Sequence, residues 1–241
     1  VSSRRYSLLQ PASGAIRAQA AVHALVRLLE RQGVRCEFGE AHLDNGRVIL
    51  AGRVIGADLV VWACGPWLNR VFPGLLPLLV TKQDVLFFGG GPEWSTPPVP
   101  AFMDYSAAAY GFGDLDWRGI NVVSDREGDE FDPTTGERSP SVESVGRVRD
   151  YLHRRFPTLA SAPIVFSRTC QYSLTPNTDF IVAAHPEYKE HWIVGGGSGH
   201  AFKHGLNIGS LAAMTALHRV EPLARFSLRP RPLPQNLRHS L

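Results

Sequence analysis

A nearly uninterrupted run of apolar residues from Ala57 to Cys64 limits the fold of this chain more than any other feature. Asp58 is the one charged residue in it, and Gly65-Pro66-Trp67 ends it. A strand that is apolar on both sides is typical of a parallel sheet whose two faces are both covered. We therefore expect a buried strand over residues 57–64, in a sheet that packs against helices.

The residues before this run predict the rest of an α/β unit. Apolar side chains at helical spacing indicate an amphipathic helix that begins at about Gly14 and is closed by Gly33. A short strand is expected over residues 34–38, and residues 47–50 and 53–55 have the pattern of two hairpin arms. Helix, strand, hairpin and buried strand in this order define the α/β class.

After residue 80 the pattern changes to short strands separated by Gly, Pro and Asp, which favours a second, more antiparallel sheet. The predicted elements are strands over 85–88, 107–110, 120–123, 163–172, 180–184 and 192–194, and helices over 141–156 and 206–217. The chain has 241 residues, of which 44% are hydrophobic, enough for one large domain or two small ones. The predicted fold class is α/β with mixed α+β character.

Charge and cysteine content narrow the classes of partner and compartment. A net charge of +3 gives no argument for nucleic acid or an anionic membrane as a partner. No run of 18 apolar residues and no signal peptide is recognisable. Three cysteines in no paired framework indicate a reduced, cytoplasmic protein. The histidines share no spacing with one another or with the cysteines, so no metal site is predicted.

The glycine-rich segment from Gly195 to Lys203 is the first candidate functional site. Glycines after a strand let the backbone approach a ligand closely, and the helix that follows offers free N–H groups to a phosphate or a flavin. The alternative is a helix-entry turn without a ligand. A serine-hydrolase elbow would need glycine where His200 stands, and no Asp/His pair follows.

Cys170, in the predicted strand 163–172, is the second candidate. One interpretation is a buried strand cysteine, the commoner position of a free thiol. The other is a reactive thiolate, which requires exposure to a ligand pocket and a lowered pKa. Arg168 lies two residues earlier and shares a strand face with Cys170, so it could assist that chemistry.

Three further expectations concern a dinucleotide-binding motif and the two ends of the sequence. No strand–G-x-G-x-x-G–helix unit occurs in the 241 residues, so the clamp that holds a dinucleotide is absent from them. Since the first residue is Val1, we expect this chain to be the C-terminal part of a longer one. The arginine- and proline-rich stretch 225–238 is expected to be an extended tail, with a binding arm as the alternative.

Several short pieces occur in the order and spacing of a known family. The pieces are Ala57-Asp58-Leu59-Val60-Val61, Gly65-Pro66-Trp67, Lys82-Gln83, Tyr110-Gly111-Phe112, Asp132-Pro133, Cys170-x-Tyr172, Thr175-Pro176, Asp179-Phe180, His185-Pro186 and Gly197-Ser198-Gly199-His200-Ala201-Phe202-Lys203. Together they resemble the C-terminal two-thirds of the FAD-dependent amine and amino-acid oxidoreductases related to monomeric sarcosine oxidase.

The resemblance implies a two-domain flavoprotein, in which a three-layer FAD-binding domain is interleaved with an antiparallel-sheet substrate domain. Residues 11–78 and 170–241 would form a partial FAD-binding domain, and residues 1–10 and 79–169 the substrate domain. The N-terminal βαβ dinucleotide unit of the family would lie upstream of this chain. The implied reaction is oxidation of the C–N bond of a secondary amine or N-alkyl amino acid by hydride transfer to FAD.

The resemblance also implies roles for individual residues. Cys170 would bond covalently to the flavin, Tyr110 would line the substrate cavity, Lys203 would hold the substrate carboxylate and His200 would lie by the flavin. Asn121 stands where the family's sarcosine oxidases carry a lysine that promotes reaction with oxygen, so a dehydrogenase or a slow oxidase is also compatible with the sequence. The further cofactor-binding candidates are Gly65, Trp67, Gly197, Ser198 and Gly199.

The sequence is also compatible with two other classes of function. One is a non-catalytic remnant or subunit that needs a partner chain to supply the dinucleotide clamp. The other is a small-molecule binding protein that has kept the scaffold and lost the chemistry.

Overall fold

The computed structural model describes residues 6–230 of the chain, which divide into two compact units. The first unit contains Thr81–Gln171 and the described residues up to Ala15. The second contains Ile16–Val80 and the described residues from Tyr172 onward. Each unit has its own sheets and helices and is described by itself.

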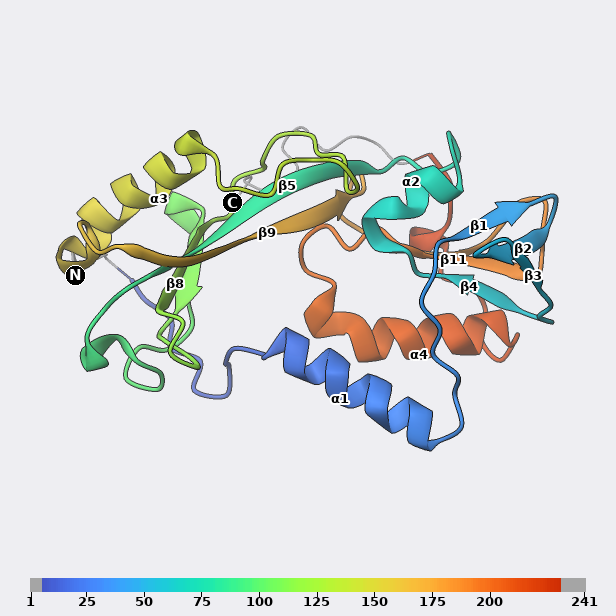
Figure 1. The fold of residues 1–241 in the computed structure, drawn as a ribbon, viewed down its shortest axis with the longest axis horizontal. Coiled ribbons are helices and arrows are strands. Elements are labelled where there is room, and N and C mark those ends of the chain that lie inside the picture. The colour runs from blue at the N-terminus through green and yellow to red at the C-terminus, as the bar shows by residue number, and fades with distance from the viewer. Residues whose placement is uncertain (1–5, 231–241) are drawn as a thin grey trace. The chain divides into compact units, whose positions relative to one another are not determined.

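The first unit is built on a five-stranded sheet in the order β6-β7-β8-β5-β9 (Figure 1). The strands are β5 (Leu79–Phe88), β6 (Phe102–Asp104), β7 (Ala109–Phe112), β8 (Ile120–Ser124) and β9 (Ile164–Leu174). β7 pairs antiparallel with β6 and β8, and β8 pairs antiparallel with β5. The prediction of a more antiparallel sheet after residue 80 is therefore confirmed.

Helix α3 (Val142–Arg155) covers one face of this sheet. The Ser141 hydroxyl begins the helix by accepting the backbone N–H of Ser144 at 3.1 Å. The core on this side is formed by Leu86, Phe88, Ala109, Ile120 and Val122 from the sheet and by Val148, Tyr151 and Leu152 from α3. Burial of these apolar side chains, rather than helix propensity alone, holds α3 in place.

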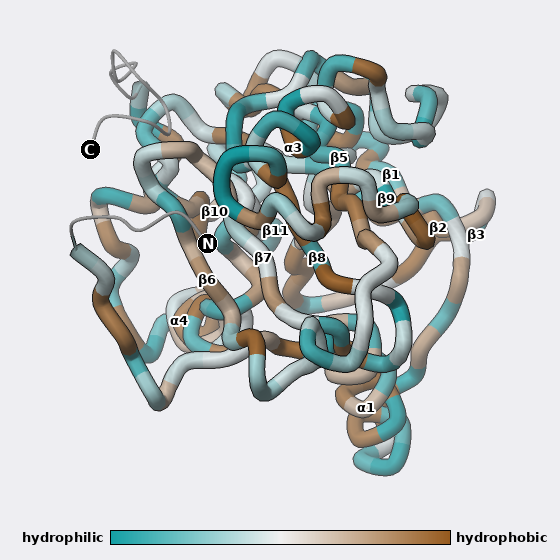
Figure 2. Tube along the Cα trace, turned by 90° about the vertical axis from the view of Figure 1, so that its left-hand side faces the viewer, coloured by the Kyte–Doolittle hydropathy of each residue, from teal (hydrophilic) through white to brown (hydrophobic). Residues whose placement is uncertain are grey.

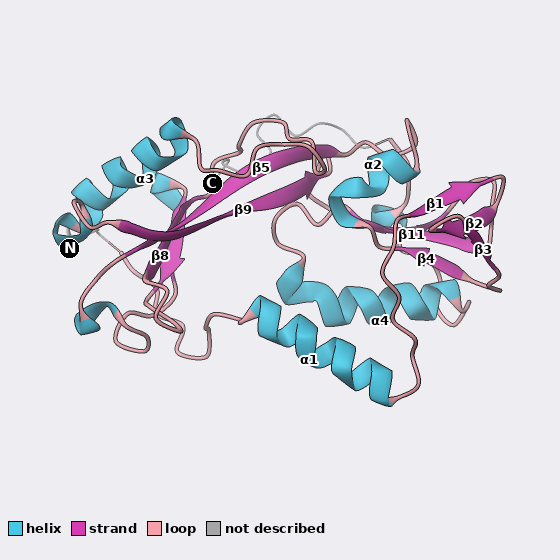
Figure 3. Ribbon diagram, in the orientation of Figure 1, coloured by secondary structure: helices cyan, strands magenta, loops and turns pink. Residues whose placement is uncertain are grey.

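The second unit contains two small sheets and most of the helical residues (Figure 3). One sheet is β1 (Ala41–Asp44), β2 (Arg47–Leu50) and β3 (Arg53–Ile55); the other is β10 (Ile181–Ala184), β11 (His191–Gly195) and β4 (Val60–Trp62). The helices are α1 (Ala18–Arg31), α2 (Leu68–Val71) and α4 (Gly205–Ala216). Apolar and polar stretches alternate along α1, as Figure 2 shows, which agrees with the predicted amphipathic helix.

The core of the second unit lies around Trp62 at the end of β4. Trp62 packs edge-on against Phe72 with ring centroids 5.6 Å apart. Its indole N–H donates to Nδ1 of His191 at 3.0 Å, so this buried polar atom has a partner. Leu68, Ile181 and Ile193 complete the cluster.

The predicted buried strand over residues 57–64 is shorter and less covered than expected. β4 spans Val60–Trp62 and pairs parallel with β11, as a strand of an α/β sheet should. However, β4 is the last described strand of its sheet, and Val61 is 45% exposed. The face of β4 that carries Val61 is therefore only partly covered by the described residues, and the prediction of burial on both faces was wrong for this chain.

Two other predicted strands differ from the structure. Residues 34–38 form no strand, and Phe38 is fully exposed there, because the first strand to find a hairpin partner is β1. The predicted strand 107–110 lies two residues later, as β7, because the Asp104 carboxylate accepts the N–H of Ala107 and holds Tyr105–Ala107 in a tight turn. The other predicted elements end within a few residues of the observed ones, except that β5 begins earlier, at Leu79.

Two further findings concern the predicted C-terminal tail and the length and polarity of the helices. Most of the predicted tail after Arg225 lies outside the described residues, and Arg225 itself pairs with Asp179. Of the helices that the structure describes, none is both long and apolar enough to cross a membrane.

Candidate functional site

The face of the first unit's sheet opposite α3 carries three of the predicted site residues. Cross-strand partners share a face, and Asn121 on β8 lies opposite Phe87 on β5 and Phe112 on β7. Tyr110 on β7 lies opposite Val123 on β8. We call this surface the Cys170 face; its members are Val85, Phe87, Tyr110, Phe112, Asn121, Val123, Phe166 and Cys170.

Tyr110 and Cys170 meet on one apolar cluster of this face. Both pack against the buried side chains of Val85, Phe87 and Val123. Cys170 is a free, half-buried thiol. The structure thus brings together a phenol and a thiol that lie 60 residues apart in the sequence, beside aromatic rings that can contact a planar ligand.

Asn121 is almost fully buried, at 1% exposure, in the middle of the same face. Its side-chain amide donates to the carbonyl oxygen of Leu86 at 3.2 Å, across the β8–β5 pair. A buried amide of this kind is neutral and already partly satisfied by the backbone. The position therefore offers a ligand on this face no formal positive charge.

Both chain neighbours of Cys170 are held by Arg138, which the sequence analysis did not single out. The Thr169 hydroxyl donates to the backbone carbonyl of Arg138 at 2.6 Å. With its amide oxygen turned toward Arg138, Gln171 accepts two guanidinium hydrogen bonds of 2.7 and 3.1 Å. Strand alternation aims both neighbours away from Cys170, so these contacts fix the strand and leave the thiol unencumbered. No pattern in the sequence pairs residue 138 with residue 171.

The glycine turn of the second unit follows β11 and leads into α4. Ser198 is fully buried inside it. The Ser198 hydroxyl donates to the Gly196 carbonyl at 3.2 Å and accepts the N–H of Thr175 at 3.2 Å, and the Ser198 N–H donates to the Ser173 carbonyl at 2.9 Å. Ser198, which lies between Gly197 and Gly199, thus holds the turn against Ser173 and Thr175, which belong to the same unit. Because this hydroxyl is buried and hydrogen-bonded within the turn, it is not exposed as a nucleophile. This agrees with the argument against a serine-hydrolase elbow.

Gly196 is required by the protein's own packing. Its φ is +67°, and a Cβ at this position would lie 2.5 Å from Cγ2 of Thr175. The glycine-rich composition of the turn therefore has a structural cause here, as the ligand-free alternative expected. Gly199, by contrast, lies at the exposed end of the turn.

His200 and Lys203 follow this turn with different environments. His200 is half-buried, 5.1 Å from the Phe180 ring centroid, and its Nε2 lies 3.1 Å from the Thr178 carbonyl. Because a carbonyl only accepts, Nε2 carries the proton, and Nδ1 is left as an acceptor when the ring is neutral. Lys203 is exposed and makes no ion pair or hydrogen bond with any described residue, so its charge is available to a ligand.

Gly65 and Trp67 form the short helical turn Gly65–Trp67 after β4. Leu68, the next residue, packs so closely on Gly195 that a Cβ there would clash with it, so this segment borders the glycine turn. Burial raises the pKa of the neighbouring Cys64 thiol, which disfavours a reactive thiolate at that position. The predicted residues thus fall into two groups: Tyr110, Asn121 and Cys170 in the first unit, and Gly65, Trp67, Gly197, Ser198, Gly199, His200 and Lys203 in the second.

Each group by itself suits a different kind of chemical group. In the first unit, an aromatic, apolar face that carries a half-buried thiol suits a flavin ring. In the second unit, the exposed ammonium group of Lys203 suits an anion. The pyrophosphate usually lies on a glycine loop at a helix N-terminus, and no G-x-G-x-x-G loop exists in the sequence. In the part of the chain that the structure describes, no three His, Cys, Asp or Glu side chains come together as a metal site.

Comparison with protein families defines the class to which this fold and site belong. Residues 3–215 match the family described as DAO, FAD dependent oxidoreductase. The match covers most of the 241 residues, so the chain belongs to this family. The predicted flavoprotein fold and the choice of FAD as the cofactor are confirmed at the level of the family.

Two curated oxidases are similar to this chain over most of its length. A monomeric sarcosine oxidase from Streptomyces avermitilis is 28% identical over 232 residues, which cover 90% of this chain and 60% of that enzyme. An N-methyl-L-tryptophan oxidase from Yersinia pestis is 25% identical and covers 92% of this chain and 62% of its own length. The chain thus spans about three fifths of the length of these relatives.

Solved structures show the same fold. The fructosyl amine:oxygen oxidoreductase amadoriase I from Aspergillus fumigatus superposes with a TM-score of 0.77 at 23% identity, over 90% of this chain and 55% of that one. A thermally stable mutant of a fructosyl peptide oxidase superposes with a TM-score of 0.78 at 17% identity, over 95% and 61% of the two chains.

Proposed function

We propose that this chain contributes to an FAD-dependent oxidoreductase that oxidises the C–N bond of a secondary amine or N-alkyl amino acid. The observation that carries the proposal is the packing of Tyr110 and Cys170 on one apolar, aromatic sheet face. Family membership supports the cofactor, and the names of the curated relatives support the substrate class. Bound FAD supplies the hydride acceptor, which no protein side chain can provide.

Cys170 is proposed as the point of covalent attachment to the flavin. It is half-buried at the edge of the aromatic cluster, whereas Cys36 is exposed on an irregular segment and Cys64 has a raised pKa. The contacts of Arg138 with Thr169 and Gln171 support this role, because they hold β9 while the thiol stays unblocked. A covalent bond would also keep the flavin bound where non-covalent contacts are few.

Lys203 is proposed to bind the carboxylate of an N-alkyl amino acid. Its ammonium group has no partner among the described residues, and a charge-assisted hydrogen bond to a carboxylate is worth about 1.5–3 kcal/mol. Tyr110, which belongs to the first unit, is proposed separately as a residue that contacts the substrate. His200 is held by Phe180 and Thr178 and would help to position the ring system rather than move a proton.

The electron acceptor is proposed to be other than oxygen, or oxygen at a reduced rate. A cation beside the flavin stabilises superoxide as the electron leaves, and Asn121 is neutral and hydrogen-bonded to Leu86.

The substrate domain is proposed to comprise residues 1–10 and 79–169, and the partial FAD-binding domain residues 11–78 and 170–241.

The clamp for the FAD pyrophosphate is proposed to come from outside these 241 residues. Two observations favour this: the sequence has no G-x-G-x-x-G unit, and β4 ends its described sheet with Val61 exposed. A further segment of the same protein or a partner chain could supply it. A non-catalytic subunit is therefore the second candidate function.

The test combines a visible spectrum, an intact mass and a reduction assay on the complete protein, in which the segment or partner that supplies the clamp is present, expressed with FAD. We expect yellow colour that survives acid precipitation, a mass increase of one FAD, and anaerobic bleaching by an N-methyl amino acid. A stably bound flavin that no secondary amine reduces would contradict the proposed reaction. A colourless, folded protein would favour the non-catalytic subunit.

A further inference from the structure

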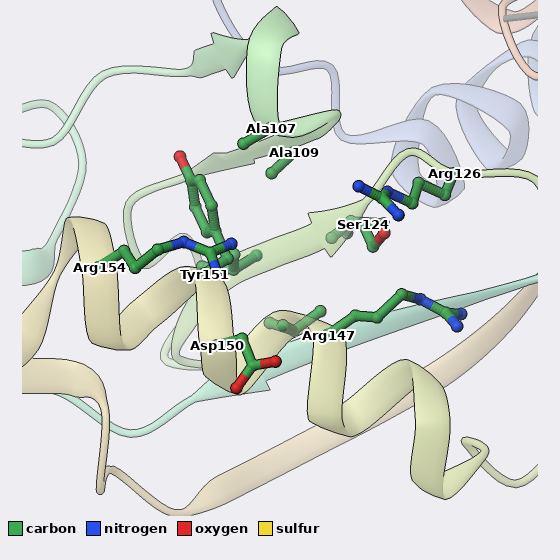
Figure 4. A pocket seen from close by; sticks show the side chains of 11 residues that line it. Ala107, Ala109, Ser124, Arg126, Arg147, Asp150, Tyr151 and Arg154 are labelled. Atoms are coloured by element: carbon green, nitrogen blue, oxygen red, sulfur yellow. The ribbon is translucent and has the colours of Figure 1, made fainter. Parts of the chain in front are cut away.

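A hollow lies on the α3 side of the first unit's sheet, away from the Cys170 face (Figure 4). Its volume is about 180 Å³, and it is bounded by α3 and by the strands β7 and β8. Val122, Val123 and Ser124 of β8 contribute to its lining, and the side chains of Asn121 and Val123 alternate toward the Cys170 face. A ligand in this hollow would therefore not occupy the proposed amine site.

Three arginines surround the hollow. Arg147 and Arg154 lie seven residues apart on α3, two turns along one helix face, with Tyr151 between them. Arg126 follows β8. In Figure 4 the guanidinium groups of Arg126 and Arg154 reach inward from opposite sides, and the carboxylate of Asp150 points away from both. Three arginines thus line a space whose lining includes one acidic residue, and the guanidinium group of Arg147 extends away from Arg154 in Figure 4.

The other two arginines of α3, Arg149 and Arg155, have hydrogen-bond or ion-pair partners. Arg149 donates to the carbonyls of Ala160 and Ala162 at 2.9 and 2.6 Å and lies 4.8 Å from the Phe88 ring centroid. Arg155 pairs with Asp104 at 3.2 Å. By contrast, the side chains of Arg126, Arg147 and Arg154 make no ion pair or hydrogen bond with the described residues.

The helix dipole does not account for all three of these exposed arginines. Arg154 lies in the last turn of α3, where a cation complements the helix dipole, so its presence has a structural reason. That reason does not extend to Arg147 near the middle of the helix or to Arg126 outside it. Like charges gathered on a concave surface repel one another, and an anion placed between them removes that repulsion.

The geometry points to a binding site for a small dianion, of the phosphate or dicarboxylate type, between α3 and β8. Guanidinium groups bind such oxyanions through paired N–H donors in a fixed planar arrangement. Arg126 and Arg154 supply these donors from opposite sides, Arg147 adds positive charge, and the hydroxyl of Ser124 adds a neutral donor. The apolar floor of Ala109, Val122 and Val148 limits the ligand to a compact one.

The test is a calorimetric titration of the full chain with inorganic phosphate and, separately, with succinate, in a low-salt buffer. We expect saturable binding of at least one dianion at one site. Arg126→Gln and Arg154→Gln should each weaken binding about tenfold, since each removes a charge-assisted contact. Arg35→Gln removes the same charge from an exposed segment of the second unit and should leave the affinity unchanged. Tighter binding of phosphate would indicate a ligand with a phosphoryl group, and tighter binding of succinate a ligand with two carboxylates.

Two results would overturn the site. One is titration that does not saturate with either dianion; the other is equal weakening by Arg35→Gln, which would mean that only the overall charge attracts anions. NMR shifts of the arginine Nε–H groups in the unaltered chain provide a readout without any mutation. Phosphate or succinate should move the signals of Arg126 and Arg154 but not that of Arg35, and unmoved Arg126 and Arg154 signals would also refute the proposal.

Discussion

Asn121 donates its side-chain amide to the carbonyl oxygen of Leu86 at 3.2 Å, in the centre of the sheet face that carries Tyr110 and Cys170. This contact binds the amide to the neighbouring strand, and the Asn121 side chain itself carries no charge. The reactivity of a bound flavin toward oxygen should depend on this residue.

We predict that Asn121→Lys speeds the reoxidation of reduced flavin by oxygen, by tenfold for every ~1.4 kcal/mol of added transition-state stabilisation. Anaerobic reduction of the flavin by the amine should change less. Stopped-flow measurement of both half-reactions checks this. Asn121→Leu, which is neutral and similar in size, is the control and should bring no gain. Rapid reoxidation in the unaltered protein would show that another cation already has this role.

A second prediction concerns the substrate carboxylate. Lys203→Met should raise KM for an N-methyl amino acid by roughly 10- to 150-fold, which corresponds to the loss of about 1.5–3 kcal/mol. The KM of the decarboxylated amine should change little, because it lacks the group that Lys203 would bind. Lys189→Met removes an equal charge from the same unit and serves as the matched control. Equal losses on both substrates would mean that Lys203 does not contact the carboxylate.

The elements that the sequence predicted best are those whose signal is local. Helix α3 follows from apolar spacing and from the Ser141 cap, and the turn around Ser198 follows from its glycines. The strand predicted over residues 34–38 does not form, because a strand needs a pairing partner and a local sequence pattern does not show whether one is present. The burial of β4 was overestimated for the same reason, since coverage of its second face is a property of neighbours.

The candidate site was only partly accessible from the sequence. A family resemblance points to Tyr110 and Cys170, and their packing on one cluster shows that they share a face. Strand alternation could have added Phe87 and Phe112 to the same face. The contact of Arg138 with Gln171 and the arginines of the α3 hollow join residues from separate elements, and no periodicity connects them.

A third prediction tests the attachment of the flavin. In flavin-loaded protein, Cys170→Ser should yield flavin that denaturation and acid precipitation release into solution. Cys36→Ser, at an exposed free cysteine, should keep the flavin attached. Absorbance of the supernatant and the intact mass of the pellet distinguish the two outcomes. Flavin that remains attached to the Cys170→Ser protein would place the bond elsewhere.

A fourth prediction concerns the affinity of the 241 residues alone. Without a G-x-G-x-x-G loop to hold the pyrophosphate, the chain should bind FAD weakly or not at all. Calorimetric titration with FAD and with riboflavin, which lacks the pyrophosphate and adenosine, should give similarly weak signals. Micromolar or tighter binding of FAD, with much weaker binding of riboflavin, would mean that these residues clamp the dinucleotide in a way that the motif does not reveal.

The last prediction concerns stability and pH, and it rests on His185. The ring is 7% exposed, stacks on Tyr188 with centroids 5.0 Å apart, and its Nδ1 accepts the backbone N–H groups of Glu187 and Tyr188, each at 3.2 Å. Burial lowers the pKa of His185, with a smaller contribution in the same direction from His191 and an opposing one from the Glu187 carboxylate.

Because the folded protein disfavours the charged ring, the unfolded chain takes up this proton at a higher pH than the folded one. The contribution of His185 to stability is therefore complete above its ordinary pKa of about 6.5 and is lost as the pH falls from there through the lowered folded pKa. Denaturant unfolding between pH 7.5 and pH 5, values on either side of about 6.5, should show a falling free energy of unfolding. His185→Asn keeps an acceptor for the two N–H groups but has no titrating ring, so it should reduce this slope. His23→Asn, at an exposed position on α1, should retain the slope of the unaltered protein. An unchanged slope in His185→Asn would show that other groups cause the loss of stability in acid.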